Sequence, residues 1–92
     1  MLIKALTNGR ISGTGSLDVS SGILGGALIT TNGSDAVTVT VQRVDSGGKT
    51  IFSVSTTVPM FAAGPMSLEG ATTAYYSISG TGGTAQLYEW IN

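Results

Sequence analysis

Residues 22–44, GILGGALITTNGSDAVTVTVQRV, decide the fold of this chain. The stretch begins with an apolar run and ends in a segment where Val37, Val39 and Val41 alternate with polar residues. Such alternation indicates a strand with one buried face. An Asn32-Gly33 pair separates the two runs, and Asn-Gly between apolar runs is typical of a tight turn. The stretch therefore predicts a β-hairpin of one apolar strand and one amphipathic strand.

Strand signals recur along the rest of the chain at intervals of about 8 to 12 residues. The 14 glycines and the many β-branched residues oppose helix formation. We expect strands at residues 2–6, 15–19, 24–31, 36–44, 50–58, 66–68, 74–79 and 84–91. Glycine-rich or Asn-rich turns are expected at residues 7–9, 32–35, 45–48 and 80–83. The pattern predicts an all-β fold in which residues 1–92 form a single domain, an antiparallel β-sandwich that is jelly-roll-like and has about eight short strands.

The same alternation predicts which side chains form the core. We expect inward positions on three strands, with the second of these strands facing the first: Val37, Val39 and Val41; Phe52 and Val54; Tyr76 and Ile78. In the last strand, Leu87 and Ile91 lie on one face. Tyr88 and Trp90 lie on the other, so both faces are apolar, and we expect one to meet the core and the other a partner.

Charged residues make up 10% of the chain, whereas about 25% is usual in soluble domains. A solvated monomer normally carries more charge, so other subunits are expected to cover much of this surface. The net charge is −1, and the four cationic residues are scattered rather than clustered. This excludes the basic stripe of a nucleic-acid-binding protein. The N-terminal apolar run is too short for a signal peptide or a membrane span, so we expect synthesis in a cytoplasm and no membrane partner.

Catalysis and metal binding lack their usual residues, because the chain has no Cys and no His. A Ser-His or Cys-His nucleophile and a thiolate metal site are therefore excluded. The Gly-x-Gly pattern at residues 80–83 is followed by a predicted strand rather than a helix, which indicates a hairpin turn and not a dinucleotide loop. The chain has five carboxylates that could form an acid/base pair or bind calcium, but none lies in a recognisable loop motif: Asp18, Asp35, Asp45, Glu69 and Glu89. Four of the five lie in or beside predicted turns, where Asp caps backbone N–H groups. We predict no enzyme activity, no cofactor and no metal.

Five aromatic residues leave two interpretations open: Phe61, Tyr75, Tyr76, Tyr88 and Trp90. They could line a platform on which sugars stack, or they could supply a core and a subunit interface. The scarcity of charge around them favours the interface.

Residues 58–66, VPMFAAGPM, contain no charge and two prolines. Proline is confined to the edges of sheets, so this stretch is not expected to form a regular central strand. It is either a loop folded over one end of the sandwich or a docking surface, together with the arm of residues 1–6. Methionine adapts to irregular partners. The predicted interface residues are Met60, Phe61, Pro65, Met66, Tyr88 and Trp90.

The order of an apolar strand, a TTNGSDA turn, an alternating Val-Thr strand and a Gly-rich turn resembles small virion proteins of tailed bacteriophages. The resemblance runs from residue 22 to the C-terminal end. It implies a structural protein of the virion, a head decoration (cement) protein that stabilises the capsid, forms homotrimers and binds the major capsid protein. The alternative is a receptor-binding or carbohydrate-binding module of a fibre or tail, followed by a tail or connector component that would form a ring.

Overall fold

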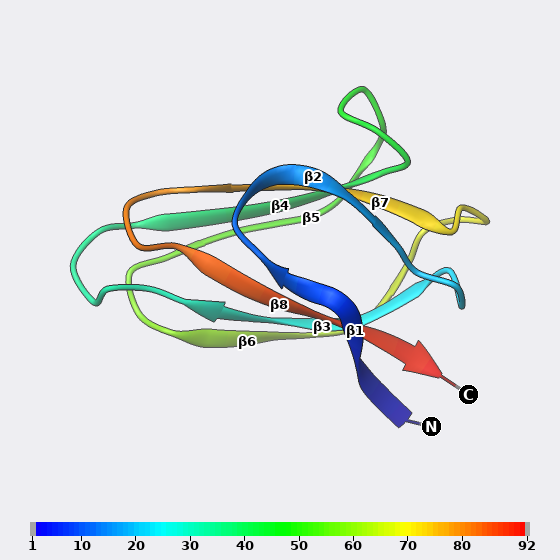
Figure 1. The fold of residues 1–92 in the computed structure, drawn as a ribbon, viewed down its shortest axis with the longest axis horizontal. Coiled ribbons are helices and arrows are strands. Elements are labelled where there is room, and N and C mark those ends of the chain that lie inside the picture. Colours follow the sequence, from blue (N-terminus) through cyan, green and yellow to red (C-terminus); the bar gives the residue numbers. More distant parts are fainter. Residues whose placement is uncertain (1, 92) are drawn as a thin grey trace.

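Eight strands and no helix make up residues 2–91, the part of the chain that the structure, a computed structural model, describes. The strands are β1 (Leu2–Ile11), β2 (Gly13–Asp18), β3 (Ile23–Thr30), β4 (Val37–Arg43), β5 (Thr50–Thr56), β6 (Met60–Ser67), β7 (Thr73–Ser79) and β8 (Thr84–Ile91). They form two four-stranded sheets with the orders β1-β8-β3-β6 and β2-β7-β4-β5. The sheets lie in two layers with the core between them (Figure 1). The predicted all-β sandwich of eight strands is confirmed.

The strands pair in a nested order around the turn between β4 and β5. β4 pairs with β5, β3 with β6, β2 with β7 and β1 with β8, each antiparallel. Every connection except the β4–β5 turn therefore passes from one sheet to the other. As a result, the two ends of the described chain lie side by side, with Leu2 opposite Ile91.

The predicted hairpin of residues 22–44 is wrong, because β3 and β4 belong to different sheets. The turn itself is present: the Asn32 side-chain oxygen accepts hydrogen bonds from the backbone N–H groups of Ser34 and Asp35, both at 2.9 Å. The connection bends between layers instead of joining neighbours, since that lets the apolar sides of both strands face the same core. For the same reason, the turn at residues 80–83 links β7 to β8 across the layers and is not a hairpin.

The core confirms the predicted inward positions. Val37, Val39 and Val41 are fully buried, as is Leu87, and Ile78 is buried too. The remaining predicted residues are partly buried and pack against this cluster: Phe52, Val54 and Tyr76. One detail is wrong: β5 does not face β4 but lies beside it, with Val54 opposite Val39 in the same sheet.

Residues 60–67 form one strand, whose pairing with β3 shifts register between Leu24 and Gly26; this corrects the expectation of a short strand at 66–68. β6 pairs with β3 only and is the edge of its sheet. An edge strand has one side without ladder partners, so Pro65 is accommodated there. The prediction that this stretch is not a central strand holds.

A turn at residues 7–9 was expected, but β1 continues through them. The pairing of β1 with β8 is interrupted between Ala5 and Arg10, and Asn8 within the interruption has a φ of 59°. Asn tolerates this left-handed conformation, so the turn residues produce a bulge rather than a chain reversal. The chain instead reverses after Ile11, where Gly13 has a φ of 67°.

Candidate functional site

Most outward side chains of the β1-β8-β3-β6 sheet are apolar, and the outward polar ones include Thr30, Thr84 and Gln86 near one end. On β8, Ala85, Leu87 and Glu89 are buried, so the alternating residues project outward, away from the core. Strand pairing places side chains of the other three strands on the same side. We call this surface the apolar face; it comprises Ile3, Ala5, Leu28, Phe61, Ala63, Pro65, Tyr88 and Trp90.

Three side chains of the apolar face are unusually exposed for their type. Ile3 is 39% exposed, and Leu28 and Phe61 are each 42% exposed. None of the eight residues is charged. Within the described strands of this sheet, Arg10 is the one charged residue that pairing places on the same side, opposite Gln86. The apolar face is therefore a water-exposed surface with little charge to hydrate it.

An aromatic pair connects two strands of the apolar face. The rings of Phe61 and Tyr88 meet edge to face, with centroids 5.7 Å apart and planes at 72°. Between their strands lies Gly26, where a Cβ would stand 2.5 Å from Phe61 Cζ. Because Gly26 lacks that atom, the ring of the edge strand can lie across β3 toward β8.

The outer surface of the β2-β7-β4-β5 sheet differs in chemistry. Its strands present hydroxyl side chains in register, and we call this surface the hydroxyl face. It comprises Thr14, Thr38, Thr40, Ser53, Ser55, Ser77 and Ser79. Some hydroxyls bond across strands, Thr38 to Ser55 at 3.1 Å and Thr40 to Ser53 at 3.0 Å. This side of the sandwich is suited to water, whereas the apolar face is not.

The structure divides the six predicted interface residues into two groups. Four of them lie on the apolar face: Phe61, Pro65, Tyr88 and Trp90. Met60 and Met66 alternate with Phe61 and Pro65 on β6, point inward and pack against the core. The interface role of the four outward residues stays a prediction. Met1, part of the predicted arm, lies outside the described residues.

The five aromatics of the predicted sugar platform do not share one surface. Phe61, Tyr88 and Trp90 belong to the apolar face. Tyr75 alternates with the inward-facing Ala74 and Tyr76 and therefore projects on the side of the hydroxyl face.

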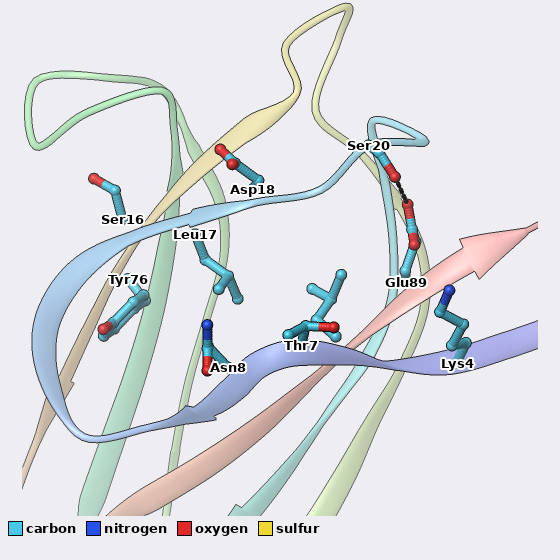
Figure 2. A pocket seen from close by; sticks show the side chains of 10 residues that line it. Lys4, Thr7, Asn8, Ser16, Leu17, Asp18, Ser20, Tyr76 and Glu89 are labelled. Atoms are coloured by element: carbon cyan, nitrogen blue, oxygen red, sulfur yellow. Dashed lines mark hydrogen bonds between the residues drawn. The ribbon is translucent and has the colours of Figure 1, made fainter.

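A groove opens where the two sheets part at one edge of the sandwich. It lies between β1 and β2, which are the edge strands of their sheets, and has a volume of about 580 Å³ (Figure 2). Its lining residues are Lys4, Leu6, Thr7, Asn8, Ser16, Leu17, Asp18, Ser20, Tyr76 and Glu89. Leu6, Leu17 and Tyr76 also pack against the core and form an apolar floor. The groove thus combines an apolar floor with polar walls.

Glu89 is the buried charge of this groove, with 5% of its surface exposed. Its Oε2 accepts hydrogen bonds from the Ser21 backbone N–H at 2.6 Å and from the Ser20 hydroxyl at 2.9 Å. The bond from the Ser21 N–H is the main reason why the pKa of Glu89 lies below its ordinary value; burial opposes this effect, and the charge of Lys4 adds to it. Lys4 lies directly opposite Glu89 on β1.

Sequence reasoning included Glu89 among the carboxylates but gave it no special role. The signal was present in the alternation of the last strand, where Glu89 occupies the same face as Leu87 and Ile91. A carboxylate at an inward strand position requires hydrogen-bond partners.

The other carboxylates serve the surface. Asp45 accepts a hydrogen bond from the Gly47 N–H at 3.0 Å, which confirms its turn role. Asp35 accepts one from the Asn32 amide at 2.7 Å, and Glu69 forms an ion pair with Lys49 at 2.7 Å. Among residues 2–91, no group of three or more His, Cys, Asp or Glu side chains is placed to hold a metal ion. In the same range, the structure has no helix long and apolar enough to span a membrane.

Comparison of this chain with protein-family models, curated proteins and solved structures finds no match.

Proposed function

We propose that this chain is a structural virion protein of a tailed phage, a non-catalytic head decoration protein that assembles with copies of itself and binds the major capsid protein. The observation that carries the proposal is the apolar face. Large exposed apolar surfaces mark interaction sites in soluble proteins. Interface cores are depleted of charge and enriched in aromatic residues, and both properties describe this surface.

The two candidate contact regions in the sequence favour this function because they meet on one surface. The stretch around Phe61 and the aromatic side of the last strand are both part of the apolar face. Ile3, from the N-terminal arm, lies opposite Trp90. One continuous surface can therefore serve the self-association and the capsid contact, and the homotrimer is the assembly that the resemblance to virion proteins implies.

We also assign the sandwich to the jelly-roll class. Eight antiparallel strands in two sheets, paired in a nested order, support this assignment. Jelly rolls occur in viral capsid proteins and in lectins, so the assignment agrees with a virion role.

A capsid-binding assay tests the proposal. It uses empty capsids of the phage that encodes this chain, prepared without this protein. Phe61→Glu places a charge in the apolar face, and Ser53→Glu places the same charge on the hydroxyl face as a matched control. The wild type and Ser53→Glu should sediment with the capsids, whereas Phe61→Glu should remain in the supernatant although it is folded. Equal binding of the two variants, or a wild type that does not bind capsids, contradicts the proposal.

A further inference from the structure

We propose that the groove between β1 and β2 is a binding site for a neutral saccharide, a mono- or disaccharide unit of a glycan. The site is separate from the apolar face and does not depend on the proposed virion role. Ligand-binding clefts have volumes of about 300 to 1,000 Å³, and the groove, with about 580 Å³, is within that range.

The mixed lining of the groove matches the chemistry of a sugar. Leu6, Leu17 and the ring of Tyr76 offer an apolar floor for the C–H face of a pyranose. The walls supply an amide, hydroxyls, an ammonium group and the carboxylate of Glu89, which donate to and accept from sugar hydroxyls. Figure 2 shows Leu17 directed from β2 toward Asn8 on β1, so apolar and polar groups meet within one space.

The carboxylate of Glu89 is held in one orientation at the wall of the groove. Its Oε2 accepts hydrogen bonds from the Ser20 hydroxyl and the Ser21 backbone N–H. The Ser21 hydroxyl also stabilises the charged form of this carboxylate. A fixed, mostly buried acceptor of this kind binds a hydroxyl more strongly than an exposed carboxylate does, because it is already desolvated and oriented.

Two local features of the backbone create the groove. The interruption in β1 separates residues 6–9 from the β8 ladder and turns Asn8 toward the groove. The Gln86 amide occupies part of the gap by donating to the Leu6 carbonyl at 3.4 Å. On β2, a Cβ at Gly15 would lie 2.6 Å from the Tyr76 hydroxyl, so this glycine allows the phenol to reach the open edge. Bulges commonly re-aim side chains at sheet edges in this way.

The charge of the lining selects among sugars. Lys4 is positive and Glu89 is negative, so these two charges balance, whereas the Asp18 side chain projects from the opposite side of β2 to Leu17 (Figure 2). Lys4 and Glu89 form no ion pair among the described residues, where Lys49 pairs with Glu69. An acidic sugar would meet repulsion from the fixed carboxylate, and a neutral one would not.

Titration of the ¹⁵N-labelled protein with sugars, followed by NMR, tests the site. The probes are glucose, galactose, N-acetylglucosamine and maltose, with glucuronic acid and N-acetylneuraminic acid as acidic counterparts. At least one neutral sugar should shift the amide signals of residues 6–8, 15–18 and 89 in a saturable manner at millimolar concentration. The acidic sugars should bind about tenfold more weakly or not at all.

Three variants connect the shifts to the groove. Asn8→Gly removes the amide but keeps the left-handed backbone, and Tyr76→Phe removes only the hydroxyl; each should reduce the affinity about tenfold through loss of one hydrogen bond. Tyr75→Phe is the matched control, because the neighbouring side chain points to the opposite side of the sheet, and it should bind like the wild type.

Three results would overturn the proposal. They are an absence of groove shifts with every neutral sugar at tens of millimolar, shifts that remain unchanged in both groove variants, and acidic sugars that bind as tightly as neutral ones. The amide spectrum of each variant reports its folding in the same experiment. The assembly state and capsid binding are measured separately, so failure of this proposal is distinguishable from failure of the virion role.

Discussion

At the scale of single residues, Glu89 is the one charged side chain that the described part of the chain buries. A carboxylate buried between two sheets loses its hydration, and hydrogen bonds must replace it. The Ser20 and Ser21 donors do so and thereby fasten the β2–β3 connection to strand β8. Glu89 therefore connects two parts of the fold that are far apart in the sequence.

The stability of the protein should depend on pH through Glu89. Its pKa in the folded state lies below the ordinary value of 4.5, so its contribution to stability is present above about pH 4.5 and is lost as the pH falls through the folded pKa. We expect the wild-type melting temperature to fall in this acid range. Glu89→Gln should be less stable at pH 7 by about 1 to 2 kcal/mol and should show a flatter pH profile.

Thermal melts between neutral pH and pH 3 measure this effect. Glu69→Gln is the control: the pKa of Glu69 is also lowered, chiefly by its bond to Lys49, but both side chains are largely exposed. Exposed ion pairs contribute little to stability, so this variant should follow the wild type. Parallel acid profiles of the wild type and Glu89→Gln would disprove the role of Glu89.

Alternation in the sequence predicted the inward residues because it depends only on neighbours along the chain. Val37, Val39 and Val41 illustrate this, since a strand of period two has to bury one side wherever it pairs. The groove could not be predicted in this way. It depends on the meeting of β1 with β2 at the open edge and on a bulge at Asn8, where the sequence predicts a turn equally well.

At the scale of elements, β6 shows how one strand serves two environments. Met60 and Met66 face the core, while Phe61 and Pro65 face outward. Pro59 and Pro65 predicted that this stretch is not a central strand, and that prediction is confirmed; proline is compatible with the edge strand that the stretch forms. The alternation of Met, Phe, Ala and Pro is apolar on both sides, so periodicity alone could not separate the core side from the exposed side.

Alanine substitutions on the two sides of β6 should affect different properties, stability on the inner side and self-association on the outer side. Met60→Ala removes packing from the core and should reduce the free energy of unfolding by about 2 kcal/mol, with self-association intact. Phe61→Ala removes an exposed ring and should weaken self-association with a smaller loss of stability. Urea denaturation and analytical ultracentrifugation of both variants measure the two quantities. If Met60→Ala instead weakened association while keeping full stability, the assignment of the two sides would be wrong.

The connection between β3 and β4 marks the limit of local signals. Asn32 forms the expected turn with Ser34 and Asp35, yet the strands on either side of it pair elsewhere. Turn chemistry fixes a local bend, whereas strand partners depend on the burial of both apolar sides in one core. Within residues 2–91, β4 and β5 are the only consecutive strands that pair, and the turn between them, where Asp45 accepts from the Gly47 N–H, was also predicted.

At the scale of the whole molecule, the sandwich has two outer surfaces of unequal character. On the hydroxyl face, Thr38 bonds to Ser55 and Thr40 to Ser53, and exposed hydroxyls are suited to water. The apolar face exposes Leu28 and Phe61, of which Phe61 forms an aromatic pair with Tyr88, and its eight residues carry no charge. We propose that copies of the chain bury this face against one another.

Sedimentation equilibrium of the isolated protein at micromolar concentration tests that claim most directly. The wild type and Ser53→Glu should have the mass of an oligomer, and the trimer is the expected state. Phe61→Glu should have the mass of a monomer and retain its β-sheet circular dichroism spectrum. A wild type that is a soluble, stable monomer under these conditions would contradict the claim.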